Sequence, residues 1–124
     1  SIAYENVVRC RGKDPQYCVK LREYYPQMKF VLDVKQAVHA GRDPMEYVRA
    51  LGNSIVHVHI SDSDAEKDCL PVGSGTMDLQ NLMECLMKEG FCGNVLQEVY
   101  RESYEKEEEV LLGYRNLEQL ISTL

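Results

Sequence analysis

The chain has 124 residues, of which 44% are hydrophobic and 27% charged, and this composition is typical of one globular domain. The formal net charge of −6 argues against a general nucleic-acid binder, because such proteins carry basic surfaces. The sequence shows no membrane-length apolar run, no signal peptide and no C-x-x-C pair among its 5 cysteines, so we expect a reduced, cytoplasmic protein with neither disulfides nor a cysteine zinc cluster.

Short apolar runs alternate with amphipathic stretches through the first half of the chain. Residues 1–8 and 29–33 are predicted as strands, and each is followed by a predicted helix, over 15–25 and 44–51. An Asp-Pro pair precedes both helices, and it marks a helix start because Asp caps the first turn and Pro fits it. The first half therefore predicts two strand–helix units.

The second half repeats this pattern with a longer loop after its first strand. The predicted elements are a β-branched strand over 54–60, a polar loop over 61–76, a helix between Asp78 and Gly90, a strand over 94–98 and a helix over 103–123. Strands that alternate with helices at this spacing predict a parallel sheet with right-handed crossovers.

Two parallel architectures fit four strand–helix units. An open doubly wound sheet normally has a glycine-rich phosphate loop after its first strand, but residues 6–12 contain a single glycine. A complete (β/α)8 barrel needs about 250 residues, and this chain has about half that length. We therefore predict an α/β fold, a parallel (βα)4 half of a TIM barrel, as a single domain over residues 1–124.

One ionisable residue falls at or near the carboxyl end of each predicted strand: Glu5, Asp33, His59 and Glu98. The carboxyl ends of barrel strands form the mouth where barrel active sites lie. Carboxylates and imidazole together suit Mn²⁺, Zn²⁺ or Mg²⁺, so these residues are candidate ligands of one divalent metal. The alternative is that each residue merely ends a strand at the solvent edge, where charges are common.

Strand alternation agrees with an inward-facing cluster. If Asp33 and His59 point into the barrel, His57 also lies inside, as a packed interior histidine. The residues that then face the helices are apolar: Phe30, Leu32, Val34, Val56, Val58 and Ile60. His39 is expected in a loop with no special role.

Several short motifs follow one another along the chain: Tyr-Glu5-Asn, Val-Leu-Asp33-Val-Lys-Gln-Ala, Val-His-Val-His59-Ile-Ser-Asp62, Leu-Pro71-Val-Gly73-Ser-Gly75-Thr-Met-Asp78 and a strand that ends in Glu98. In this order they resemble the sugar phosphate isomerase/epimerase superfamily, the xylose isomerase-like TIM barrels that also include endonuclease IV (AP endonuclease family 2). The resemblance covers nearly the whole chain and implies that it corresponds to strands five to eight of the barrel.

The resemblance implies a metal-dependent sugar or sugar-phosphate isomerase or epimerase. Members of the ketose 3-epimerase type hold one divalent metal with residues that match Glu5, Asp33, His59 and Glu98. In that chemistry the two glutamates also move the proton on opposite faces of the substrate, so Glu5 and Glu98 are the expected catalytic acid/base pair. The expected partner is a small sugar or sugar phosphate.

The sequence departs from the family pattern at two places. Many members carry His where this chain has Gln36, which leaves substrate choice open. Cys69 and Leu70 occupy the region where endonuclease IV-like members need further Asp and His ligands, which disfavours a trinuclear zinc site. Arg9 and Lys35 lie just beyond strand ends, so these two residues, together with Gln36, are the candidate substrate-binding residues.

Half a barrel has two open sheet edges and an uncovered apolar interior. We expect Val31, Ile55 and Leu96 to be exposed unless a second half covers them, and we expect a homo-oligomer or pairing with the missing half-barrel. The chain alone is then weakly active or inactive. The alternatives are an endonuclease IV-like phosphodiesterase and a non-catalytic barrel fragment that serves in binding or assembly.

Overall fold

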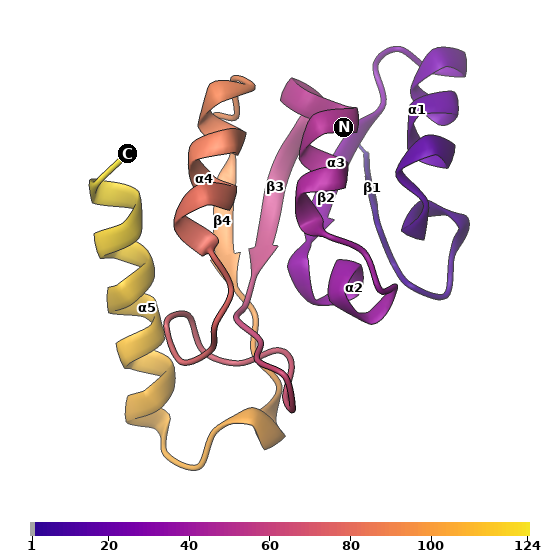
Figure 1. Ribbon diagram of the computed structural model, residues 1–124. Helices are drawn as coiled ribbons and strands as arrows, with labels where there is room; N and C mark the ends of the chain where they lie inside the picture. Colours follow the sequence, from indigo (N-terminus) through magenta and orange to yellow (C-terminus); the bar gives the residue numbers. More distant parts are fainter. Residues whose placement is uncertain (1) are drawn as a thin grey trace.

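The computed structural model describes residues 2–124, in which four strands form one parallel sheet in the order β1-β2-β3-β4 (Figure 1). The strands are β1 (Ala3–Glu5), β2 (Lys29–Asp33), β3 (Ile55–Ile60) and β4 (Asn94–Gln97). The α-helices are α1 (Pro15–Tyr24), α2 (Val34–His39), α3 (Pro44–Leu51), α4 (Leu79–Lys88) and α5 (Glu107–Ser122). Three short 3-10 turns complete the chain: η1 (Arg11–Lys13), η2 (Gly52–Ser54) and η3 (Arg101–Ser103). This confirms the predicted α/β class with a parallel sheet.

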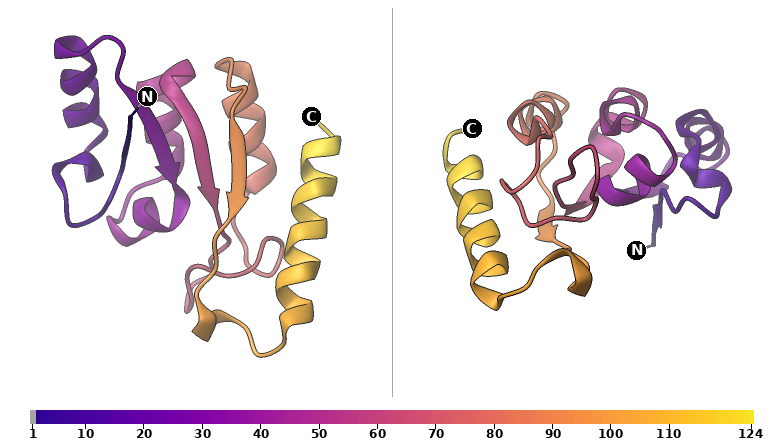
Figure 2. Two further views of the ribbon diagram at one scale, coloured as in Figure 1. Left: turned by 180° about the vertical axis from the view of Figure 1, so that it is seen from behind. Right: turned by 60° about the horizontal axis from the view of Figure 1, so that its bottom comes forward.

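The helices α1, α3 and α4 cover one face of the sheet, and α5 stands beside β4 (Figure 2). Seen from behind, the strands lie in front of these helices, so no helix covers the other face in the part of the chain that the structure describes. The apolar core lies between the sheet and the helices, where its largest fully buried side chains include Phe30, Leu32, Val58, Ile60, Tyr47, Val48, Met83 and Leu86. No helix among residues 2–124 has the length and apolar character needed to cross a membrane.

Aspartate caps begin three of the helices at the predicted places. The Asp14 side chain accepts a hydrogen bond from Gln16 N, and the Asp78 side chain accepts one from Asn81 N. Asp43 forms a capping box with Glu46 at the start of α3. These local signals explain why α1, α3 and α4 follow the sequence pattern closely.

Two predicted elements have different bounds in the structure. The strand predicted over 1–8 is confined to Ala3–Glu5, and its first residue lies outside the described residues. The helix predicted from residue 103 begins at Glu107, because the 3-10 turn η3 comes first.

Helix α2 was not predicted. It starts directly after β2 because the Asp33 side chain accepts a hydrogen bond from Gln36 N and caps it without an intervening loop. The prediction that His39 lies in a loop is therefore wrong, since His39 is the last residue of α2.

A β-bulge changes which side chains of β3 face the helices. Phe30 pairs with Ile55, but Val31 pairs with His57, so one residue of β3 is skipped. Ile55 therefore joins the core at 1% exposure, and the expectation that it would be exposed is wrong. Val31 is half-buried, whereas Leu96 is 52% exposed on the uncovered face, as predicted.

Candidate active site

The four predicted strand-end residues meet at the carboxyl edge of the sheet. Glu5 and Asp33 are the last residues of β1 and β2, and His59 is the second-last residue of β3. Asp33 and His59 are direct partners in the ladder. Glu98 follows β4 at once, and its N–H donates to Ile60 O at 3.0 Å, which extends the pairing by one step.

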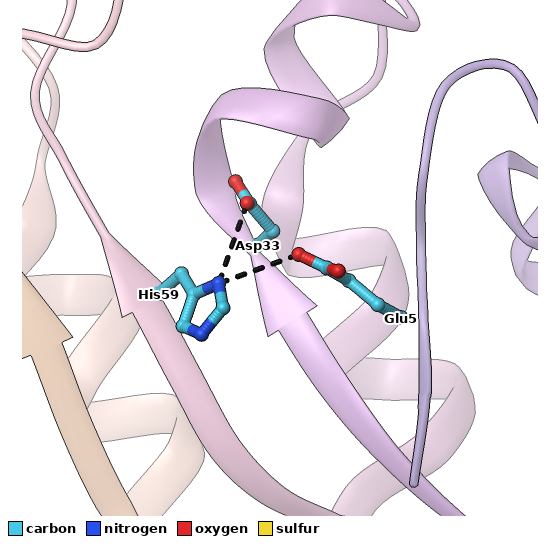
Figure 3. Close-up of side chains that lie close together, drawn as sticks. All are labelled: Glu5, Asp33 and His59. Atoms are coloured by element: carbon cyan, nitrogen blue, oxygen red, sulfur yellow. Dashed lines mark ion pairs between the residues drawn. The ribbon is translucent and has the colours of Figure 1, made fainter. Parts of the chain in front are cut away.

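His59 Nδ1 is the point on which three carboxylates converge. It lies 3.3 Å from Glu5 Oε1, 3.5 Å from Asp33 Oδ2 and 3.3 Å from Glu98 Oε2. Figure 3 shows Glu5 and Asp33 pointing toward this nitrogen from neighbouring strands. One ligand-type atom each from Glu5, Asp33 and His59 lies within 4.8 Å of the other two, and Glu98 approaches the same nitrogen from the opposite neighbour of β3.

Three atoms of this cluster are buried without a hydrogen-bond partner: Asp33 Oδ2, His59 Nδ1 and Glu98 Oε2. Buried polar groups are normally paired, because an unpaired one loses its hydration without compensation. The other oxygen of Asp33 already accepts from Gln36 N at 3.1 Å, so one carboxylate caps α2 and also faces the cluster. The unpaired atoms are of the types that bind a divalent cation.

The three carboxylates of the cluster repel one another, so it is unfavourable for all of them to be charged at once. Burial raises the pKa of Glu5, and the neighbouring carboxylate of Asp33 raises it further. The charge of Glu98 acts in the same direction. A positive charge placed among these groups therefore relieves their repulsion.

Lys35 brings an ammonium group into the cluster. Its Nζ lies 3.4 Å from Asp33 Oδ2 and 3.3 Å from Glu98 Oε2, and its side chain is only 7% exposed. Burial lowers the pKa of Lys35, but the charges of Asp33 and Glu98 outweigh burial and leave this pKa raised. The ammonium also lies 5.1 Å from the centroid of the Tyr100 ring, within cation–π range.

The other candidate substrate-binding residues lie further out. Gln36 Oε1 accepts a hydrogen bond from Val8 N at 2.8 Å, so this side chain holds the segment after β1. Arg9 is exposed in the turn that follows this segment. Of the three candidates, only Lys35 makes ion pairs with the strand-end carboxylates in the described residues.

Asn6 supports the cluster and was not identified from the sequence. It is 3% exposed, its side chain donates to Asp33 O at 3.0 Å, and it accepts from Asp33 N at 2.7 Å. The two bonds tie the end of β1 to the end of β2. A buried Asn directly after Glu5 was the available signal, because an amide side chain satisfies both polar groups of one neighbouring residue.

Asp62 holds the long loop that follows β3. Its carboxylate accepts from Ser63 N at 2.8 Å, Gly73 N at 3.0 Å and Met77 N at 3.1 Å, and it is 2% exposed. A Cβ on Gly75 would lie 2.4 Å from Asp62 Oδ1, so only glycine fits there. Gly73 has a φ of +87°. These glycines shape the loop.

The same loop also holds the backbone of Glu98, through Cys69. Cys69 Sγ donates to Glu98 O at 3.3 Å, and Tyr100 N donates to Cys69 O at 3.3 Å. Asp68 pairs with His39 of α2, whose ring centroid is 6.3 Å from that of Tyr100. Helix α2, the loop after β3 and the residues after β4 therefore contact one another next to Glu98, and the sequence pattern did not show these contacts.

His57 lies on the same face of β3 as His59, one layer deeper. The two ring centroids are 5.0 Å apart in an edge-to-face arrangement. Burial lowers the pKa of His57, and the neighbouring His59 lowers it further. His57 is half-buried on the face of the sheet that no helix covers, so the packed interior histidine stays a prediction.

A profile of the family described as xylose isomerase-like TIM barrel matches residues 2–120. The chain belongs to this family. This confirms the resemblance that the sequence motifs indicated. The chain is similar to the fructoselysine 3-epimerase of Escherichia coli O157:H7, with 30% identity over 91 residues, which covers 73% of this chain and 33% of the relative. It is 33% identical over 73 residues to an uncharacterized protein of Mycobacterium leprae, covering 56% of this chain and 26% of that protein.

Solved structures show the same fold. A D-tagatose 3-epimerase-like protein superimposes with a TM-score of 0.70 at 22% identity, over 99% of this chain and 47% of that one. The IolI protein, whose crystal structure has a binding zinc atom, superimposes with a TM-score of 0.73 at 20% identity, over 99% of this chain and 49% of that one. The chain thus spans about half the length of these two solved chains and a third or less of the two relatives above.

Proposed function

We propose that this chain is the C-terminal half, strands five to eight, of a divalent-metal-dependent sugar or sugar-phosphate isomerase or epimerase. The proposal depends on one observation above all, the convergence of three carboxylates on His59 Nδ1 with unpaired buried atoms among them. The family membership supports it, as do the epimerase names of two similar proteins.

The donor set fits one divalent cation, held by Glu5, Asp33, His59 and Glu98. Carboxylate oxygen and imidazole nitrogen are ligands that Mn²⁺, Zn²⁺ and Mg²⁺ accept. Three negative charges around one imidazole also favour a cation of charge +2 at this place. The zinc in the similar IolI structure supports a metal of this class.

The acidic side chains of the cluster differ in solvent exposure, and this difference supports different roles for them. The Asp33 side chain is 2% exposed, whereas those of Glu5 and Glu98 are 32% and 43% exposed. Asp33 is therefore suited to hold the cation, while both glutamates reach it and remain accessible to a substrate. Glu5 comes from β1 and Glu98 from the end of β4, the two outer strands of the sheet, so they approach from opposite sides.

These positions suit proton transfer by the two glutamates. A bound divalent cation polarises the carbonyl and hydroxyl oxygens of a sugar and so acidifies the adjacent C–H. One glutamate removes that proton from carbon on one face, and the other returns a proton on the opposite face, which inverts the centre. Lys35, Gln36 and Arg9 are proposed to bind polar or charged oxygens of the substrate.

We also propose that residues 1–124 form a single domain and that the edges of β1 and β4 pair with a complementary half-barrel or with a second copy. A largely apolar groove of about 700 Å³ lies between β4 and α5, away from the strand-end cluster, and its lining includes Leu96, Leu111 and Tyr114. Each of these three side chains is about half exposed, which supports a covering partner at this edge.

Metal binding is the first test of this function. The purified chain, stripped with chelator and dialysed against Mn²⁺, Zn²⁺ or Mg²⁺, is expected to retain one equivalent of one of these ions by elemental analysis. Asp33→Asn is expected to reduce retention, whereas Glu23→Gln on the exposed surface of α1 is the charge-removing control. Retention of no metal by the wild-type chain would favour the non-catalytic assembly module instead.

Substrate class is tested by a screen of the full-length protein. Ketoses and ketose phosphates are compared with abasic-site DNA, and stereochemical inversion is followed by NMR in deuterated water. Deuterium at the inverted carbon supports the proposal, because the proton then exchanges with solvent on the enzyme. Cleavage of the DNA without any sugar conversion would replace the proposal with the endonuclease IV-like alternative.

A further inference from the structure

The side chain of Lys35 already places a positive charge beside two of the proposed metal ligands, Asp33 and Glu98. Lys35 Nζ approaches Asp33 Oδ2 and Glu98 Oε2 at 3.4 and 3.3 Å, and these are the same oxygens that face His59 Nδ1. Both oxygens are buried without a hydrogen-bond partner. The ammonium therefore contributes a charge where a metal is expected, without the directed bonds that would fully satisfy these oxygens.

We propose that Lys35 is an internal counter-cation of the metal site, which neutralises Asp33 and Glu98 when no metal is bound and must be displaced when one binds. This inference rests on one part of the proposed function alone, namely that the site binds a divalent cation. A metal bound at roughly 2.0–2.2 Å from the same oxygens would lie close to the ammonium as now placed. Two cations at that separation repel each other strongly in a partly buried site.

The ring of Tyr100, which the ammonium already contacts, is proposed to hold the ammonium after it leaves Asp33 and Glu98. Its centroid is 5.1 Å from Lys35 Nζ, within the range in which an ammonium is attracted to an aromatic face. Tyr100 is 36% exposed, so movement toward the ring also brings the charge nearer to water. The ring is positioned by the backbone bond from Tyr100 N to Cys69 O and lies beside His39.

The metal affinity of charge-matched variants tests this role. Lys35→Met keeps the length of the side chain but removes its charge, and it is expected to tighten Zn²⁺ binding at least tenfold in a competition titration with a chromophoric indicator. Lys35→Arg keeps the charge and is expected to bind no more tightly than the wild type. Lys20→Met, on the exposed surface of α1, makes the same substitution away from the site and is expected to leave the affinity unchanged.

The outcomes separate this inference from the proposed function. If wild type and Lys35→Met both bind no divalent ion, the proposed metal site is wrong. If both bind with equal affinity, or if Lys35→Met binds more weakly, the site stands and the counter-cation role is wrong. Tyr100→Leu is expected to weaken Zn²⁺ binding severalfold in the presence of Lys35 but to leave it unchanged in the Lys35→Met background. An equal loss of Zn²⁺ affinity in both backgrounds would refute the proposed contact between the displaced ammonium and the Tyr100 ring.

A measurement on the unsubstituted protein covers the case in which Lys35→Met fails to fold. Lysine acylation is read by peptide mass spectrometry with and without saturating Zn²⁺, and Lys20 serves as the internal reference. Modification of Lys35 relative to Lys20 is expected to rise at least threefold with Zn²⁺, because displacement exposes the buried ammonium. Unchanged or reduced modification of Lys35 would overturn the inference.

Discussion

Replacement of Glu5 by Gln is expected to change the stability of the metal-free and metal-loaded protein in opposite directions. Without metal, Glu5 Oε1 lies 3.3 Å from His59 Nδ1 in a cluster that also contains the carboxylates of Asp33 and Glu98. Glu5→Gln removes one of three mutually repelling charges and leaves the side chain nearly the same size. We therefore expect the free energy of unfolding of the metal-free chain to rise.

With metal, the same substitution removes one of the proposed ligands. At a Zn²⁺ concentration a hundredfold above Kd, binding to the native state alone stabilises the wild type by about 2.7 kcal/mol. If loss of Glu5 weakens affinity tenfold, the same Zn²⁺ concentration stabilises the variant by about 1.4 kcal/mol. For a domain of this length 1 kcal/mol moves Tm by roughly 3–6 °C, so the Zn²⁺-induced shift falls from roughly 8–16 °C to about half.

Differential scanning calorimetry at fixed pH, with chelator or with Zn²⁺, measures both effects on one sample. Glu23→Gln makes the same change on the exposed surface of α1 and is expected to alter neither Tm nor its response to Zn²⁺. A lower Tm for metal-free Glu5→Gln, or a Zn²⁺ shift as large as that of the wild type, would show that Glu5 belongs to no shared cation site.

Other parts of the fold give further measurable expectations. Arg22→Met is expected to lower the free energy of unfolding by about 2–3 kcal/mol in urea titrations, since the guanidinium donates to Leu51 O at 2.8 Å and Ala50 O at 3.0 Å at the end of α3; an unchanged midpoint would contradict this. Burial raises the pKa of Cys18 to about 11, so this thiol is expected to react with alkylating reagents far more slowly than exposed Cys92 between pH 7 and 9. Comparable rates for the two thiols would refute that burial. Sedimentation velocity is expected to show concentration-dependent self-association that a charge at the exposed Leu96 weakens; a strictly monomeric chain would contradict pairing with a second copy through the β4 edge.

The sequence predicted those features that local chemistry determines. Asp14, Asp43 and Asp78 marked helix starts because a carboxylate caps orphan N–H groups wherever the chain turns into a helix. The ends of β2, β3 and β4 were predicted to within one residue because apolar runs end at or next to an ionisable residue, whereas the end of β1 was placed three residues too late. Parallel strands bring their carboxyl ends to one edge, so the convergence of Glu5 and His59 followed from topology.

What the sequence did not predict depends on contacts between segments distant along the chain. The β-bulge that places Ile55 in the core arises from the pairing of β3 with β2. A prediction that assumes regular alternation of side chains along each strand does not detect such a bulge. The double hydrogen bond of Asn6 to the Asp33 backbone joins residues 27 positions apart. Helix α2 was not predicted because Asp33 was interpreted only as a candidate ligand at the end of a strand. In the structure, one of its oxygens accepts from Gln36 N and caps α2, whereas the other faces His59.

That division between the two oxygens of Asp33 bears on which ions the protein can accept. The bond from Gln36 N fixes the plane of the carboxylate, so the oxygen that faces His59 points in a direction set by the start of α2. If a cation binds here as proposed, Asp33 adjusts least to its radius, and the adjustment comes from the longer, more exposed side chains of Glu5 and Glu98. Ion selectivity would then depend on how far these two glutamates extend around one fixed oxygen.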